Sequence, residues 1–256
     1  MSIRAFSLSV WIASLFAAAA SAQTAPQQNV VRVFEGGAGG RMQSIFVPPK
    51  AGAPFSFVLA TEWTRMQSNG GNFTLTNERH IARDSKGRIY QERWILVPKG
   101  SNIKSTMDVF QITDPERHTW LNCITATKVC DLYMYHLTTD EQFPPAIFPS
   151  GPLPDGNGFR DHEDLGLGTV EGQETHGYRE STTVNPGKMG NDKPLITMRE
   201  FWYSPHLAVN LISIVDTPES GKQVFRAKEI STAEPDPDVF NVPHEYKIVD
   251  RRNEAN

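Results

Sequence analysis

The sequence predicts an all-β protein with little helix, built as one domain whose curved antiparallel sheet is half-barrel or sandwich-like. Three observations predict this fold class. Beyond the N-terminal apolar run, no segment shows a sustained 3.6-residue apolar period. Short segments instead alternate apolar and polar residues, as strands with one buried face do. Clusters of Gly, Pro, Asp and Asn separate these segments at hairpin-like intervals, and 256 residues suit one β-rich domain.

The N-terminus has the pattern of an export signal. Arg4 precedes the apolar run Val10–Ala20, and Ala20-Ser21-Ala22 is a small-x-small cleavage site. We therefore expect residues 1–22 to be a cleavable signal peptide and the protein to be periplasmic or secreted. The run is shorter than the roughly 20 residues of a membrane-spanning helix, so no stable membrane anchor is expected. Loss of Arg4 moves the formal net charge from −4 to about −5, which argues against binding to nucleic acid.

The mature chain is expected to have three parts. Residues 23–43 are rich in Gln and Gly and are predicted to form a flexible arm. Residues 44–250 are predicted to form the single antiparallel domain, and residues 251–256 a polar tail. Proline and glycine are dense over residues 143–160, which we interpret as a long surface connection because the strands on either side look alike. A division into two domains at this connection is the alternative.

The first strands are predicted from alternation and turn chemistry. Phe55–Trp63 alternates strictly and has one strongly apolar face. Phe73–Arg83 and Arg88–Val97 flank Asp84-Ser85-Lys86-Gly87, where Gly at the fourth position suits the left-handed residue of a short hairpin loop. A hairpin is therefore expected there.

The two cysteines lie in a second hairpin pattern. Met107–Thr113 and His118–Cys123 flank a turn at Asp114-Pro115-Glu116, and a further strand is expected around Cys130. In an oxidising compartment, a Cys123–Cys130 disulfide would stabilise this hairpin by about 2–3 kcal/mol. A zinc site is the alternative, but the C-x-x-C or His spacing typical of such sites is missing.

In the second half of the chain, the residue pattern predicts longer strands. The segment Asp161–Pro205 is interpreted as two long antiparallel strands joined by a wide polar loop, with a tight turn at Glu171-Gly172-Gln173. Ala208–Val215 and Gln223–Ile230 form a further pair. Asp236 is expected to cap one helical turn. The residues expected to fix the terminus onto the sheet are Phe240, Val242 and Tyr246.

Several segments together resemble a group of uncharacterised secreted bacterial proteins. These segments are RDSKGRIYQE (Arg83–Glu92), ITDP (Ile112–Pro115), DLGLGTVEGQETHGYRESTT (Asp164–Thr183), REFWYSP (Arg199–Pro205) and EPDPDVFNVPHEY (Glu234–Tyr246). More distantly, the signal peptide, the consecutive strands and the closing F-x-V-P-x-x-Y segment are similar to the LolA/RseB-like superfamily of periplasmic lipoprotein carriers and envelope sensors. This resemblance implies a curved half-barrel around an apolar cavity, and it implies no catalytic residues.

Asp161-His162-Glu163-Asp164 could supply carboxylates and an imidazole to a metal ion, with His176, His206 or His244 completing the site after folding. Alternate side chains of an extended segment point in opposite directions, so these residues cannot all converge on one ion. We interpret the cluster as a solvated acidic loop, and we expect no catalytic residue, metal or cofactor. A metal-dependent enzyme using Asp161–Asp164 is the third-ranked function.

Apolarity on both sides of some strands points to binding. Ala208–Val215 has apolar residues on both faces, and Trp94–Val97 has no polar side. Such strands must be covered twice, either by a sandwich core or packed loop, or by a ligand on a concave surface. The sequence therefore favours a non-catalytic module that binds a lipid, an acyl chain or a lipoprotein. The alternative is an envelope structural or sensor protein that acts through protein contacts. The residues expected to line or rim the ligand surface are Phe57, Trp63, Trp94 and Trp202.

Overall fold

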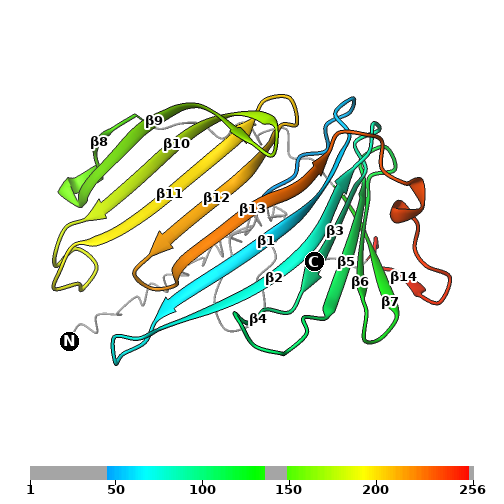
Figure 1. Cartoon of the computed structure of the whole chain (residues 1–256), viewed down its shortest axis with the longest axis horizontal. Coiled ribbons are helices and arrows are strands. Elements are labelled where there is room, and N and C mark those ends of the chain that lie inside the picture. Colours follow the sequence, from blue (N-terminus) through cyan, green and yellow to red (C-terminus); the bar gives the residue numbers. More distant parts are fainter. Residues whose placement is uncertain (1–44, 136–148, 254–256) are drawn as a thin grey trace, which may run out of the picture. The chain divides into compact units, whose positions relative to one another are not determined.

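The computed structural model describes residues 45–135 and 149–253. The signal peptide predicted over residues 1–22 and the arm predicted over residues 23–43 lie outside the described residues, as does the first part of the connection predicted over residues 143–160. The described residues form one open, curved sheet of 14 strands (Figure 1). This confirms the predicted all-β class and its curved antiparallel sheet.

The strand order follows the chain only in part. From one edge to the other it is β14-β7-β6-β5-β3-β2-β1-β13-β12-β11-β10-β9-β8, and β4 pairs with β2 beside this path. Neighbours are antiparallel except β14 and β7, which are parallel. β1 and β13, which are far apart in sequence, therefore lie side by side in the middle of the sheet (Figure 1). The elements are β1 (Phe55–Met66), β2 (Asn72–Arg83), β3 (Ile89–Trp94), β4 (Val97–Pro98), β5 (Met107–Asp114), β6 (Thr119–Ile124), β7 (Val129–Met134), β8 (Gly151–Pro152), η1 (Pro154–Gly156), β9 (Gly158–Val170), β10 (Gln173–Val184), β11 (Leu195–Ser204), β12 (Val209–Thr217), β13 (Gly221–Ser231), η2 (Pro237–Phe240) and β14 (Lys247–Asp250).

The predicted turns form for the expected reasons. Glu171 and Gly172 alone separate β9 from β10, and both have positive φ, 47° and 78°, as a two-residue hairpin turn of the primed type requires. In the β2–β3 loop, the Asp84 carboxylate accepts hydrogen bonds from the backbone N–H groups of Lys86 and Arg88. Gly87 has a φ of 85° there. The sequence prediction of both hairpins is confirmed.

Two predictions about loops need correction. Asp161–Asp164, interpreted as a solvated acidic loop, lies within β9 and pairs with β10. Regular structure also begins earlier than the end of the predicted connection, because β8 and the first residues of β9 precede residue 161. Proline does not prevent this, since Pro152 lies on the short outermost strand, where no ladder bond from its nitrogen is needed.

The two faces of the sheet differ along β1. One face, called the core face below, carries Phe57, Leu59 and Trp63, each at most 2% exposed. The opposite face, called the charged face, carries the exposed Glu62 and, on neighbouring β2, Glu78. These carboxylates form ion pairs with Lys99 and Lys228, each with an N–O distance of 2.8 Å. Alternation in β1 therefore separates the two faces as predicted.

The main hydrophobic core is centred on β1, β12 and β13. Its buried members are Ile45, Val47, Phe55, Phe57, Leu59, Trp63, Ile81, Ile89, Val170, Leu207, Val209, Leu211, Ile212, Phe225 and Ala227. β12 is buried on both faces, because Leu211 is fully buried and its neighbour Ile212 is 6% exposed. The prediction that this strand is covered twice is confirmed.

A second cluster lies on the charged face of β3, β5, β6 and β7. Phe110, Ile112, Cys123 and Cys130 are its centre, and partly buried residues of the C-terminal segment pack on it. Asp236 caps η2 by accepting a hydrogen bond from the N–H of Asp238 at 2.9 Å. Phe240 is buried in the cluster, and Val242 and Tyr246 pack against it. The predicted attachment of the C-terminus to the sheet is confirmed.

The predicted disulfide is present in this second cluster. Cys123 and Cys130 lie directly opposite each other on β6 and β7, and both are fully buried. No other cysteine occurs in the sequence. The bond therefore cross-links two neighbouring strands beneath the C-terminal segment.

Arg83 is a fully buried charge at the end of β2. Its guanidinium donates to the backbone carbonyls of Ala53, Pro48 and Leu207 and lies 4.6 Å from the centre of the Phe55 ring. Burial lowers its pKa to about 10. One side chain thus joins the segment before β1 to the β11–β12 turn.

Candidate functional site

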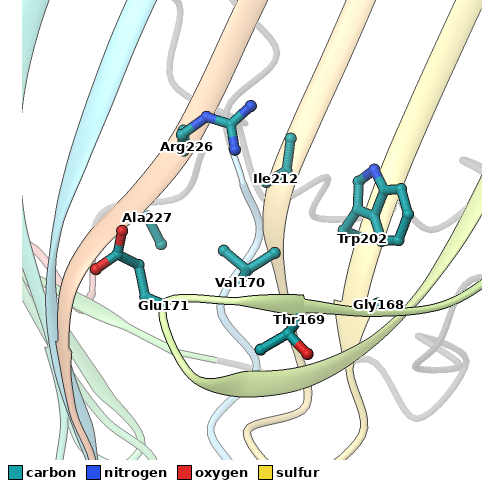
Figure 2. A pocket seen from close by; sticks show the side chains of 8 residues that line it. All are labelled: Gly168, Thr169, Val170, Glu171, Trp202, Ile212, Arg226 and Ala227. Atoms are coloured by element: carbon teal, nitrogen blue, oxygen red, sulfur yellow. The ribbon is translucent and has the colours of Figure 1, made fainter.

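A half-open cavity of about 390 Å³ lies under the tip of the β9–β10 hairpin. Figure 2 shows the hairpin passing across β11 and β12, with its tip ending beside β13 and the side chains of the cavity around it. Small-molecule sites commonly have volumes of about 300–1,000 Å³, so this cavity is at the small end of that range. Its lining residues are Gly168, Thr169, Val170, Glu171, Trp202, Ile212, Arg226 and Ala227.

Trp202 forms one wall of the cavity because two glycines leave room for its ring. Gly177 is its direct partner on β10, and Gly168 is on the next strand. A Cβ atom on Gly168 would lie 2.4 Å from the Cζ3 atom of the indole, and one on Gly177 would lie 2.9 Å from three ring atoms. Any larger residue at either position would therefore displace the ring.

A charged network fixes the Trp202 ring at its other end. The indole Nε1 donates to Glu200 at 3.0 Å, and Arg179 donates to the same carboxylate from Nε at 3.1 Å and from Nη2 at 2.8 Å. Arg179 also donates to Glu163 on β9 at 2.8 Å. Burial alone would raise the pKa of Glu200, but the hydrogen bonds from Trp202 and Arg179 lower it below its usual value. The ring is therefore held in place by an ionised acceptor.

The remaining walls combine apolar and charged side chains. Val170 and Ile212 are buried, at 7% and 6% exposure, and supply the apolar part. Arg226 and Glu171 are exposed and carry opposite charges. In Figure 2 the Arg226 guanidinium is directed toward the Ile212 side of the cavity, whereas Glu171 lies at the turn beside Ala227. The cavity therefore has an apolar floor and a charged rim.

The structure does not bring the four predicted ligand-binding residues together. Phe57 and Trp63 lie on the core face. Trp202 lies on the charged face, since the register leads from Ala60 through Arg226 and Ile212 to Trp202.

Trp94 also lies on the charged face, because its Nε1 donates to Glu92 at 2.7 Å. Glu92 is on that face because it follows Tyr90, the partner of Ala82, by two residues. Of the four predicted residues, Trp202 lines the cavity. Phe57 and Trp63 are 2% and 1% exposed, so a ligand could reach them only by displacing what covers them.

The sequence interpretation missed most of the cavity. Ile212 belongs to the predicted two-sided strand Ala208–Val215 and Arg226 to the predicted strand Gln223–Ile230, but the sequence pattern singled out neither. The available signal was the pair of glycines, Gly168 and Gly177, in strands that pair next to an aromatic strand. Glycine weakens a strand unless something approaches it closely, and here the Trp202 ring does so.

The acidic cluster of β9 is divided between separate contacts. Glu163 pairs with Arg179 at 2.8 Å, while Asp164 contacts His176 Nε2 at 2.6 Å and Asp161 accepts from Ser150 at 3.2 Å. The pKa of Asp164 is lowered first by the hydrogen bond from the N–H of Gly166 and then by His176. Within residues 45–135 and 149–253, no three His, Cys, Asp or Glu side chains are grouped so that they could hold a metal ion. These contacts give no support to a metal-dependent enzyme.

A membrane-spanning helix, judged by length and apolarity, is not found in the part of the chain that the structure describes.

Comparisons with known proteins give structural neighbours only. No protein-family model matches the sequence, and no curated protein matches it. The MucA/MucB complex of Pseudomonas aeruginosa is 15% identical over 77% of this chain, with a TM-score of 0.37. This chain spans 58% of that chain, less than two thirds of its length.

Two further solved structures are a putative outer membrane lipoprotein-sorting protein domain from Vibrio parahaemolyticus and LprF from Mycobacterium bovis. The first is 6% identical over 74% of this chain and 90% of its own, with a TM-score of 0.27. The second is 9% identical over 73% of this chain and 90% of its own, with a TM-score of 0.28. Similarity at this level concerns the fold and says nothing about a ligand of this chain.

Proposed function

We propose that the protein is an exported, non-catalytic binding module for an apolar or acylated ligand. The observation that carries this proposal is the cavity between the β9–β10 hairpin tip and β11–β13, with Trp202, Ile212 and Val170 as its apolar walls. A flat aromatic ring and two branched aliphatic side chains suit an alkyl segment. Burying such a segment gains about 0.8 kcal/mol for each CH₂ group.

Preorganisation of Trp202 supports the proposal. Half-buried aromatic rings often need to rearrange before they bind, and this lowers affinity. Here Glu200 holds the indole N–H, while Gly168 and Gly177 lie under the ring. The ring therefore offers a fixed surface to a ligand. Phe57 and Trp63 would take part only in a conformation that uncovers the core face.

The chain contains a matched control for Trp202. Trp94 is also half-buried on the charged face, and its indole N–H also donates to the glutamate two residues earlier, Glu92. Trp94 is not among the residues that line the cavity. Trp202→Leu and Trp94→Leu therefore remove the same kind of side chain and the same hydrogen bond, but only the first alters the cavity.

The test measures displacement of an environment-sensitive fatty-acid probe, together with native mass spectrometry of protein purified without detergent. We expect the wild type to bind the probe, Trp202→Leu to weaken binding at least tenfold, and Trp94→Leu to change it less than twofold. Equal losses in both variants would contradict a site at the cavity, because Trp94 does not line it. No probe binding and no co-purified lipid in the wild type would refute the proposed function.

A second candidate function is contact with an envelope protein partner, which the outer edge of β9 favours. β8 pairs only with Arg160 and Phe159, so the described residues provide no strand partner on the outer side of residues 161–170. Leu167 on this edge is 90% exposed. Unpaired strand edges accept an added strand from another chain. Leu167→Lys should then abolish capture of a partner in envelope extracts while leaving probe binding unchanged.

A further inference from the structure

Arg226 is a cation at the cavity rim with no partner among the described residues. It is exposed on β13 and pairs across the sheet with Ile212 on one side and Ala60 on the other. Neither neighbour can neutralise it. The carboxylates of the same face on β1 and β2, Glu62 and Glu78, form ion pairs with Lys99 and Lys228, each at 2.8 Å. Arg226 is therefore available to an anion from outside.

The other carboxylate near the cavity wall is also occupied. Glu200 accepts hydrogen bonds from Trp202 and Arg179, so its charge is balanced within the wall. The guanidinium of Arg226 is directed over the apolar floor toward Ile212 (Figure 2). A ligand that lies against Ile212 and Trp202 would consequently end beside five N–H donors in a fixed plane, which match the two oxygens of a carboxylate or phosphate.

Glu171 is the group that opposes an anion. It lies on the β9–β10 turn beside Ala227, at the end of the cavity opposite to Trp202 (Figure 2). An anion at Arg226 is attracted by the guanidinium and repelled more weakly by this exposed carboxylate. The rim is therefore positive at Arg226 and negative at Glu171. Removing the charge of Arg226 should weaken the binding of an anionic ligand, and removing the charge of Glu171 should strengthen it.

We infer that the cavity binds an amphiphile whose alkyl part lies on Trp202, Ile212 and Val170 and whose terminal oxyanion is bound by Arg226. This inference rests on the proposed function and names its ligand class. The shared chemistry is an alkyl chain that ends in a carboxylate or a phosphate. A free fatty acid and a lysophospholipid with a terminal phosphate are the two sources, and the experiment separates them.

The chain again provides a matched control. Lys228 lies two residues from Arg226 on the same strand and the same face, is half-buried, and forms an ion pair with Glu78. It does not line the cavity. Arg226→Gln and Lys228→Gln both remove one positive charge from β13, so they separate a local contact from a general effect of net charge.

The experiment measures binding of lauric acid, its uncharged methyl ester and lauroyl lysophosphatidic acid by calorimetry at pH 7.5 and low salt. Arg226→Gln should weaken binding of one or both anionic compounds about tenfold and leave the methyl ester unchanged, whereas Lys228→Gln should change none of them more than twofold. Glu171→Gln should strengthen anion binding about two- to threefold. The compound that loses more affinity in Arg226→Gln identifies the preferred oxyanion.

Two results would overturn the inference without affecting the proposed function. The first is binding of all three compounds with the same affinity in Arg226→Gln as in the wild type. The second is an equal loss in Arg226→Gln and Lys228→Gln, which would mean that net charge alone acts. Absence of binding for all three compounds, the uncharged ester included, would instead refute the proposed function itself.

Discussion

Replacement of Arg83 by methionine tests the most heavily bonded buried charge among the described residues. The fully buried guanidinium donates to three backbone carbonyls, those of Ala53, Pro48 and Leu207. Methionine has a similar length and fills most of the space, but it donates no hydrogen bond. A carbonyl left without a donor in the interior costs about 1–3 kcal/mol. Relief of the desolvation cost of Arg83 offsets part of this sum, so we expect a net loss of about 3–5 kcal/mol.

The assay is urea unfolding followed by tryptophan fluorescence, with the free energy of unfolding extrapolated to water. Arg117→Met is the control, because the Arg117 side chain is 82% exposed and its removal should cost less than about 0.5 kcal/mol. Arg83→Lys should give an intermediate loss, since an ammonium group keeps the charge but not the planar fork. A loss below about 1 kcal/mol for Arg83→Met, with an unchanged urea slope, would show that water or rearranged backbone replaces the three bonds.

Three further predictions concern the disulfide, a buried tyrosine and export. Cys123→Ala/Cys130→Ala should lower the free energy of unfolding by roughly 2.4 kcal/mol, the loop-entropy value for a sequence separation of 7; an unchanged urea midpoint would contradict this. The buried Tyr178 hydroxyl has no hydrogen-bond partner among the described residues, so Tyr178→Phe should stabilise the protein at pH 7 by up to about 1 kcal/mol. Burial, then Tyr203 and Glu180, raise the pKa of Tyr178 to about 12. The unfolded tyrosine loses its proton near pH 10, so wild-type stability should fall between about pH 10 and pH 12, and less so in Tyr178→Phe; equal declines would argue against it. Finally, intact-mass measurement of envelope protein should find cleavage after Ala22, and a species that retains residues 1–22 would refute the export signal.

Much of the local structure followed from the sequence because it depends on neighbouring residues. Strict alternation identified β1 and its apolar face, and the turn chemistry of Gly87 and Gly172 fixed two hairpins. The spacing of Cys123 and Cys130 across a turn gave the disulfide. Each of these inferences uses residues within about ten positions of one another, where backbone geometry leaves few alternatives.

The error at Asp161–Asp164 shows where local reasoning stops. Four polar residues in a row favour a loop on composition, yet β9 remains a strand because β10 provides a complete hydrogen-bonding partner. On that partner strand, Arg179 forms an ion pair with Glu163, and His176 contacts the carboxylate of Asp164. Tertiary context overrides weak β propensity when a partner strand satisfies the backbone.

The sequence by itself determined the β class, the strands near each turn, the disulfide and the capped turn that fixes the C-terminus. The pairing of strands decided the candidate site. Alternation shows which residues of one strand share a face. It does not show which residues of two different strands lie on the same face of the sheet, because this depends on the pairing register and is changed by each bulge. Register shifts lie at Arg93/Trp94, Gly177/Tyr178 and Trp202/Tyr203. Only the complete register therefore places Trp202 and Trp94 on the face opposite to Phe57 and Trp63, and brings Arg226 next to Ile212.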